Sequence, residues 1–280
     1  MSTAPIGIFD SGMGGLTIVK AIHNLLPYEN IIYFGDTQHT PWGDKSKDAI
    51  KHYATSICDI LLNHGCKVIV VACNTASAVA YQAIQKHTKD IPIINVIDPV
   101  VDFISTKLDN KKIGLIGTKQ TVASNNYIEK IRAKTTTIQV QALATPLLVP
   151  LIEEGMANTL PAKLILNMYL ADPQLQNIQA LILGCTHYPL LKEQIQDFYE
   201  NKVLIIDSTK LTAFCLQQIL LQQNLANQNH THAKQVFYIS DHNPHFVKLA
   251  KLFFPHDITV SPFPLWEIET NIKLPVRVFD

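Results

Sequence analysis

The chain has 280 residues, of which 47% are hydrophobic and 16% are charged, as in an ordinary globular protein. Lysine plus arginine and aspartate plus glutamate both total 23, so the net charge is zero and indicates no polyanion-binding surface. The N-terminus has no signal-peptide pattern, and no apolar run approaches the about 18 residues of a membrane span. We therefore expect a soluble, cytoplasmic protein with no nucleic-acid or membrane partner.

Strand-like and helix-like segments alternate along the whole chain. The first stretch is predicted to hold strands at 5–9, 30–34, 67–72 and 92–96, and helices at 16–26, 47–63 and 76–87. The next is predicted to hold strands at 112–116, 138–142, 180–183 and 203–206, and helices at 121–133, 162–170 and 190–199. The last is predicted to hold helices at 211–223 and 245–254, and strands at 235–239 and 257–260. Repeated strand–helix units predict mainly parallel sheets with right-handed crossovers.

Two parts of the chain look related. A strand that opens with Ile-Gly at Ile6 is followed later by a strand that ends at Cys73, and the same order recurs from Ile113 to Cys185. The length also favours two domains, since a domain holds about 100–200 residues. The stretch after residue 207 has no third cysteine turn, so we assign it to the first domain. We predict an α/β fold with a first domain of residues 1–98 plus 208–280 and a second of residues 99–207.

Five cysteines, an odd number with no C-x-x-C pair, favour reduced thiols over a disulfide framework or a zinc ribbon. His230 and His232 lie in a polar stretch that is typical of a surface loop, where solvated histidines are more common than metal ligands. We therefore predict no metal site.

Cys73 and Cys185 each end a short aliphatic run that is typical of a buried parallel strand. The carboxyl ends of such strands are where open α/β sheets place their catalytic groups, and a helix start nearby favours a reactive thiolate. Two such thiols, one from each half, indicate acid and base groups that face each other across one substrate. The alternative is that cysteine fills the core as a small apolar residue, which we accept for the remaining three, Cys58, Cys66 and Cys215.

Polar side chains follow several of the predicted strands. They are Asp10 and Ser11 in a glycine-rich turn, Asp36 after the second strand, Asn74 and Thr75 after the first cysteine, and Thr186 and His187 after the second. The glycine spacing fits neither a dinucleotide fingerprint nor a P-loop. Together these groups are suited to hold the carboxylate and ammonium of an α-amino acid. Glu153 is placed either to orient His187 or at an exposed helix end.

Four motifs in this order and spacing resemble the glutamate racemase family over nearly the whole chain. They are Phe9-Asp10-Ser11-Gly12-x-Gly14-Gly15, Tyr33-Phe34-Gly35-Asp36-Thr37, Ala72-Cys73-Asn74-Thr75 and Gly184-Cys185-Thr186-His187-Tyr188-Pro189. The resemblance implies two pseudo-symmetric α/β domains with the active site in the cleft between them. It implies an isomerase without a cofactor that supplies D-glutamate for bacterial peptidoglycan, and hence for cell wall biogenesis and cell shape. A homodimer is the expected assembly.

The residues expected to touch glutamate are Asp10, Ser11, Trp42, Gly43, Asn74, Thr75, Thr118, Thr121, Thr186 and His187. The chain departs from the family at Trp42, where the family usually has tyrosine; tryptophan keeps a ring and an N–H donor but lacks the phenol oxygen. Asp36 and Glu153 are expected to support the site. The chain begins almost at its first strand, so we expect no activation by a cell-wall precursor.

By the same resemblance, Cys73 takes the α-proton of D-glutamate and Cys185 that of L-glutamate, with Asp10 and His187 tuning the respective thiols. Three other functions stay open on the sequence. A related racemase would act on aspartate, a binding module would close on an amino acid without chemistry, and a thiol hydrolase would use Cys185 and His187. Against the hydrolase, residues two apart rarely form a nucleophile–base pair.

Overall fold

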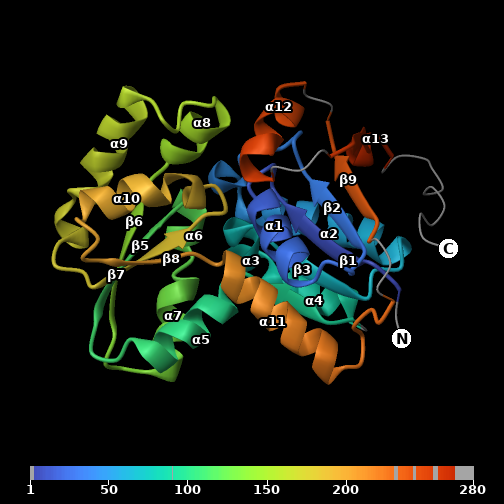
Figure 1. The fold of residues 1–280 in the computed structure, drawn as a ribbon, viewed down its shortest axis with the longest axis horizontal. Helices are drawn as coiled ribbons and strands as arrows, with labels where there is room; N and C mark the ends of the chain where they lie inside the picture. The colour runs from blue at the N-terminus through green and yellow to red at the C-terminus, as the bar shows by residue number, and fades with distance from the viewer. Residues whose placement is uncertain (1–2, 90, 230–232, 242–243, 255–257, 269–280) are drawn as a thin grey trace.

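The computed structural model describes residues 3–89, 91–229, 233–241, 244–254 and 258–268, so the predicted loop histidines, His230 and His232, lie outside the described residues. It contains two parallel sheets that lie side by side, each flanked by helices (Figure 1). The predicted α/β class with two mainly parallel sheets is confirmed. Among the described residues, no helix combines the length and apolar character that crossing a membrane requires.

The first sheet has the strand order β10-β9-β2-β1-β3-β4, and all its neighbouring strands run parallel. Its strands are β1 (Ile6–Asp10), β2 (Ile31–Gly35), β3 (Val68–Val71), β4 (Ile93–Asn95), β9 (Gln235–Ile239) and β10 (Val260–Pro262). The helices of this part are α1 (Leu16–Leu25), α2 (Lys47–Asn63), α3 (Asn74–Val79), α4 (Tyr81–Thr88), α11 (Thr209–Gln222), α12 (Pro244–Phe253) and α13 (Leu265–Ile268).

The second sheet has the order β6-β5-β7-β8, again with parallel neighbours. Its strands are β5 (Lys112–Gly117), β6 (Gln139–Ala144), β7 (Ala180–Gly184) and β8 (Leu204–Ile206). Its helices are α5 (Asp98–Lys107), α6 (Lys119–Ala123), α7 (Asn126–Lys134), α8 (Leu148–Glu153), α9 (Leu160–Leu170) and α10 (Lys192–Phe198). Short 3-10 turns cover Trp42–Asp44, Pro173–Leu175 and Tyr188–Leu191.

The strands of the first sheet come from residues 6–95 and 235–262, and those of the second from 112–206. The chain therefore leaves the first sheet after β4 and returns to it after β8. The domain limits at 98/99 and 207/208 stay a prediction, because a sheet assignment does not divide the helices and loops between two domains.

Alternate residues of β1 pack into different clusters of the core. Ile6 and Ile8 join a cluster that extends into the second sheet, whereas Phe9 joins a separate cluster with Ile32 and Ile69. Because successive side chains of a strand point to opposite faces, the first sheet is buried on both sides. Polar side chains that could act in catalysis are therefore expected at the ends of its strands.

The main departures from the sequence prediction are helix breaks and short helices. The predicted helix at 121–133 is two helices, because Asn125 takes the left-handed conformation with φ 55° between α6 and α7. The helix at 76–87 is likewise divided into α3 and α4 at Ala80. Three helices, α5, α8 and α13, are absent from the sequence prediction. The last strand is β10 rather than 257–260, and residue 257 lies outside the described residues.

Candidate active site

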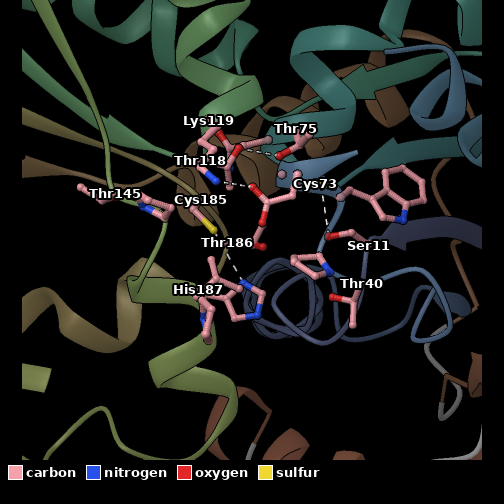
Figure 2. A pocket seen from close by; sticks show the side chains of 18 residues that line it. Ser11, Thr40, Cys73, Thr75, Thr118, Lys119, Thr145, Cys185, Thr186 and His187 are labelled. Carbon is pink, nitrogen blue, oxygen red and sulfur yellow. Dashed lines mark hydrogen bonds and ion pairs between the residues drawn. The ribbon is translucent and has the colours of Figure 1, made fainter. Parts of the chain in front are cut away.

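A cavity of about 40 Å³ lies where the strand ends of both sheets meet (Figure 2). Predicted site residues that line it are Ser11, Trp42, Gly43, Cys73, Asn74, Thr75, Thr118, Cys185, Thr186 and His187. The two cysteines approach this cavity from different sides, Cys73 after β3 and Cys185 after β7. The structure thus brings together residues more than 100 positions apart, as the two-thiol hypothesis requires.

Other predicted site residues do not line the cavity but contact residues that do. They are Asp10, Asp36, Thr121 and Glu153. The cavity also has lining residues that the sequence analysis missed: Thr40, Pro41, Asp44, Lys119, Thr145, Pro146, Val149 and Pro150. Thr145 could have been found, because it directly follows the end of β6 as Thr118 follows β5.

Cys73 is the N-cap of α3, and its buried sulfur accepts a hydrogen bond from the backbone N–H of Ala76 at 3.5 Å. The thiol donates to Oγ of Ser11 at 3.5 Å. Burial, and after it the nearby charge of Asp10, raises the pKa of Cys73 to about 12. Cys73 therefore carries its proton at neutral pH.

Cys185, His187 and Glu153 form a chain of contacts on the other side of the cavity. The Cys185 sulfur lies 3.7 Å from His187 Nδ1, and His187 Nε2 lies 3.0 Å from Glu153 Oε1. Burial lowers the pKa of His187, but the contacts with Cys185 and Glu153 outweigh it, so this pKa is raised well above its ordinary value. His187 is consequently an imidazolium at neutral pH, and its positive charge can stabilise a thiolate on the neighbouring sulfur.

The turn after β7 brings the Cys185 and His187 side chains together although the two residues are only two positions apart. The contact fits the expected partnership of His187 with this thiol, and it removes the spacing argument against a thiol hydrolase. Of the two interpretations of Glu153, the structure shows the contact with His187 rather than an isolated helix end.

Asp10 is fully buried beneath the cavity at the end of β1. One carboxylate oxygen accepts from the Gly12 backbone N–H at 3.1 Å, and the other accepts from the Thr186 hydroxyl at 3.4 Å. Burial raises the pKa of Asp10, while the positive charge of His187 opposes this. Asp10 therefore links the turn after β1 to the turn after β7.

Three threonine hydroxyls form a triangle that joins the two sheets. Thr75 Oγ1 lies 2.9 Å from Thr118 Oγ1 and 3.4 Å from Thr121 Oγ1, and the last two lie 3.0 Å apart. Thr75 belongs to α3, whereas Thr118 caps α6 of the second sheet. Hydroxyls that now bond one another can turn to donate to an entering carboxylate.

Asp36 supports the loop that carries Trp42. Its buried carboxylate accepts from the Trp42 indole N–H at 3.0 Å, the Ser240 hydroxyl at 2.8 Å and the Trp266 indole N–H at 2.9 Å, and it contacts His39 Nδ1 at 3.0 Å. The indole N–H of Trp42 is thus already bonded. Any contact of Trp42 with a ligand would come from its ring or its backbone.

Two further contacts join residues 44 and 45 to α6. Lys119 forms a 3.0 Å ion pair with Asp44, and the Gln120 side chain donates to the Lys45 carbonyl at 2.9 Å. Within the residues that the structure describes, no group of three or more histidine, cysteine or acidic side chains could hold a metal ion.

We expect Glu153→Gln to lower the pKa of His187, because the variant removes the carboxylate that stabilises the imidazolium. The folded pKa of His187 lies above the unfolded value of about 6.5. Its stabilisation of the fold is therefore complete below that pH and is lost as the pH rises through the folded pKa. In the variant the pKa of His187 should be lower, so this stabilisation should be lost from a lower pH. An NMR titration of labelled histidine measures the pKa of His187.

Glu154→Gln is the matched control, since it removes the same charge from the exposed neighbouring residue. It should leave the His187 titration unchanged. An unaltered His187 titration in Glu153→Gln would contradict the role assigned to the carboxylate.

The chain is similar in sequence to known proteins. The model of the Asp/Glu/Hydantoin racemase family matches residues 18–215. A glutamate racemase of Chlorobaculum tepidum is 41% identical over 252 residues, which cover 90% of this chain and 93% of the relative. A glutamate racemase of Neisseria meningitidis serogroup C is 43% identical over 237 residues, covering 85% and 87%.

A solved structure gives the same result for the fold. The crystal structure of glutamate racemase from Francisella tularensis subsp. tularensis SCHU S4, in complex with D-glutamate, matches with a TM-score of 0.89 and 36% identity. The match covers 95% of this chain and 99% of that one.

Proposed function

The chain belongs to the Asp/Glu/Hydantoin racemase family, and we propose that this racemase interconverts L-glutamate and D-glutamate by two-base proton transfer at the α-carbon. The observation that carries the proposal is that two cysteines, one from each sheet, line a single cavity. The relatives named above are glutamate racemases, and the Francisella enzyme was crystallised with D-glutamate, which supports glutamate as the substrate.

The reaction requires a base on one face of the α-carbon and an acid on the other. A thiolate takes the α-proton, so that the C–H bond breaks, an S–H bond forms and the electron pair stays on the substrate as a carbanion. The opposite thiol then gives its proton to the other face. This exchange inverts the α-carbon and needs no cofactor.

The surroundings of the two sulfurs differ. Cys185 lies beside the His187 imidazolium, whereas burial raises the pKa of Cys73 to about 12. We assign removal of the α-proton of L-glutamate to Cys185 and that of D-glutamate to Cys73. Asp10 and His187 tune the basicity of Cys73 and Cys185, respectively.

Stabilisation of the carbanion is assigned to fixed donors around the carboxylate groups. The hydroxyls of Ser11, Thr75, Thr118 and Thr186, together with the Asn74 amide, are the donors that line the cavity. Thr121 does not line the cavity, but its hydroxyl is hydrogen-bonded to those of Thr75 and Thr118. Donors held in place before the reaction stabilise developing charge without reorganising, and each contributes about 3 kcal/mol in favourable cases.

Incubation of the reduced, cofactor-free protein with L-glutamate in D2O tests the proposal. We expect optical rotation to decay while deuterium enters the α-carbon. If aspartate reacted and glutamate did not, the protein would be an aspartate racemase. Binding of glutamate without exchange would instead favour a binding module.

The Cys185–His187–Glu153 contacts also resemble the nucleophile, base and orienting acid of a thiol hydrolase. A hydrolase has no need for the second thiol, and Cys73 lines the same cavity. We therefore favour racemisation, and an acyl-enzyme detected on Cys185 by mass spectrometry would reverse this choice.

We propose further that the D-glutamate is used for bacterial peptidoglycan, and hence for cell wall biogenesis and cell shape. Depletion of the protein in its host should then make growth depend on added D-glutamate. A homodimer in the cytoplasm stays a prediction, which light scattering on the purified protein would check.

A further inference from the structure

Asn74 carries a buried amide nitrogen with no partner at the cavity. Its side chain is only 2% exposed, yet Nδ2 makes no hydrogen bond within the described part of the chain. Asn74 is also one of the residues that line the cavity. Buried donors are normally paired, so an unpaired one at a ligand site indicates that the ligand supplies the acceptor.

The other end of this amide is held by Tyr127, which comes from the second sheet's helix α7. The Tyr127 hydroxyl donates to Asn74 Oδ1 at 2.7 Å, and Tyr127 is itself 1% exposed. Burial, and after it the charge of Cys185, raises the pKa of Tyr127, so its hydroxyl keeps the proton that it donates. An amide has its oxygen and nitrogen on opposite sides of one carbon. Fixing the oxygen toward Tyr127 therefore leaves the nitrogen for the ligand.

We infer that Tyr127 is a positioning residue for racemisation, whose hydroxyl fixes the Asn74 amide so that Nδ2 donates to a carboxylate oxygen of the substrate. This inference rests on the proposed function. Without the Tyr127 hydroxyl, the amide can rotate by half a turn and present its oxygen instead. Two oxygen acceptors would then face each other, and the substrate would bind less tightly.

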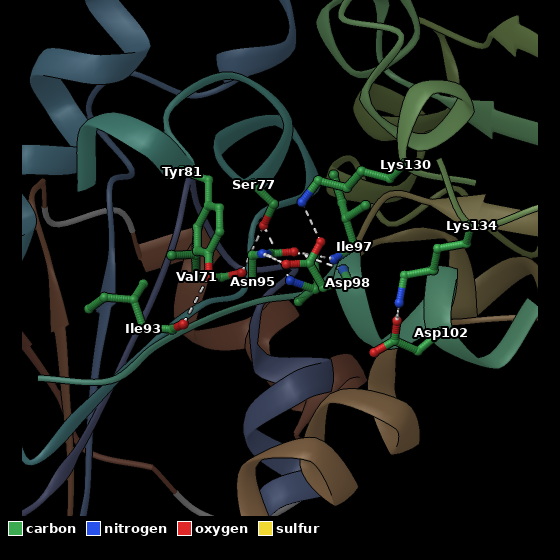
Figure 3. A network of polar contacts seen from close by, with 11 residues as sticks. Val71, Ser77, Tyr81, Ile93, Asn95, Ile97, Asp98, Asp102, Lys130 and Lys134 are labelled. Atoms are coloured by element: carbon green, nitrogen blue, oxygen red, sulfur yellow. Dashed lines mark hydrogen bonds and ion pairs between the residues drawn. The ribbon is translucent and has the colours of Figure 1, made fainter. Parts of the chain in front are cut away.

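The helix that carries Tyr127 is itself fixed by ion pairs with α5 (Figure 3). Lys130 pairs with Asp98 and Lys134 pairs with Asp102. Asp98 also accepts from the Asn95 side chain at 2.6 Å, and Asn95 ends β4 of the first sheet. Tyr127 therefore reaches Asn74 from a helix that is anchored where the chain passes from one sheet to the other.

Tyr127→Phe tests the inference, because it removes only the hydroxyl. We expect KM for glutamate to rise about tenfold with a smaller change in kcat, the loss that follows from one misplaced hydrogen bond. When Tyr127→Phe is added to Asn74→Ala, KM for glutamate should rise less than about twofold, because the amide that Tyr127 positions is already absent. Effects that multiplied instead would mean that Tyr127 acts independently of Asn74, and would overturn the inference.

Tyr81→Phe is the matched control. Its hydroxyl donates to the Ile93 carbonyl at 3.1 Å in the same polar region, without touching Asn74. Both variants should lose similar stability in urea, but only Tyr127→Phe should raise KM. Equal KM values for Tyr127→Phe and the wild type would refute the positioning role.

A second variant does not depend on how well Tyr127→Phe folds. Asn74→Asp places an oxygen where Nδ2 stands and should raise KM more than Asn74→Ala does, because a carboxylate repels the substrate. Equal or better binding by Asn74→Asp would show that Nδ2 is not the donor. Wild-type activity is measured first, so failure of the proposed function appears as an inactive parent rather than as an altered variant.

Discussion

Replacing Cys73 or Cys185 with alanine is expected to slow glutamate racemisation at least about a thousandfold. Each change removes one of the two groups that transfer a proton, and such groups typically contribute about 10²–10⁴-fold. Because the two thiols act in sequence on one α-carbon, the double variant should be little slower than either single one. Polarimetry with each enantiomer measures the loss.

The remaining thiol in each variant should still act on one enantiomer. Removing the α-proton requires only the base, so Cys73→Ala should continue to exchange the α-proton of L-glutamate with D2O, through Cys185. Cys185→Ala should exchange only that of D-glutamate, through Cys73. Proton NMR of each enantiomer in D2O measures the loss of its α-proton signal and so shows which enantiomer each variant exchanges. The opposite pattern would reverse the assignment of the two cysteines.

Cys58→Ala is the matched control for both variants. Cys58 is as deeply buried as the site cysteines, but it lies in α2 within the apolar core of the first sheet. We expect it to lower stability and to leave the racemisation rate nearly unchanged. Near-normal turnover in Cys73→Ala or Cys185→Ala, measured beside this control, would rule out the two-base mechanism.

Gly14→Ala is expected to reduce kcat/KM about a hundredfold without any change to a polar group. A methyl group at residue 14 would lie 2.4 Å from Thr186 Oγ1 and 2.5 Å from His187 Nδ1, far inside van der Waals contact. The turn after β7 would therefore have to move away, and with it the sulfur of Cys185. A displacement of about 1 Å at a reacting group is enough for a loss of this size.

Gly12→Ala controls for the loss of a glycine in the same turn. Its added methyl group would meet nothing closer than 3.4 Å, at the Thr40 hydroxyl. We expect a loss below about threefold, measured as kcat/KM beside the thermal stability of both variants. Gly14→Ala with wild-type kinetics would mean that the two turns do not need to approach this closely for activity.

The strands and their polar ends could be read from the sequence because each feature is local. A short aliphatic run that ends in Cys73-Asn74-Thr75 or Cys185-Thr186-His187 predicts both a buried strand and what lies at its end. The break between α6 and α7 was missed because it depends on one backbone angle at Asn125, within a pattern that otherwise continues as a helix.

The parts of the site that were missed come from tertiary structure. Tyr127 lies on an ordinary amphipathic helix, and nothing near it in sequence indicates that its hydroxyl meets Asn74, 53 residues earlier. His187 as a partner of Cys185 follows from the resemblance, whereas the contact of His187 with Glu153, 34 residues earlier, was one of two interpretations that the sequence left open. Packing of two sheets against each other decides such contacts.

The unequal surroundings of the two thiols have a consequence for the direction of flux. L-glutamate and D-glutamate are mirror images with the same free energy in water, so no arrangement around Cys73 and Cys185 can favour one of them at equilibrium. The value of kcat/KM must therefore be the same in the two directions at every pH. The unequal surroundings of the two thiols can change kcat and KM separately in each direction, but not the equality of their ratios. Net formation of one enantiomer then depends on a separate reaction that consumes it.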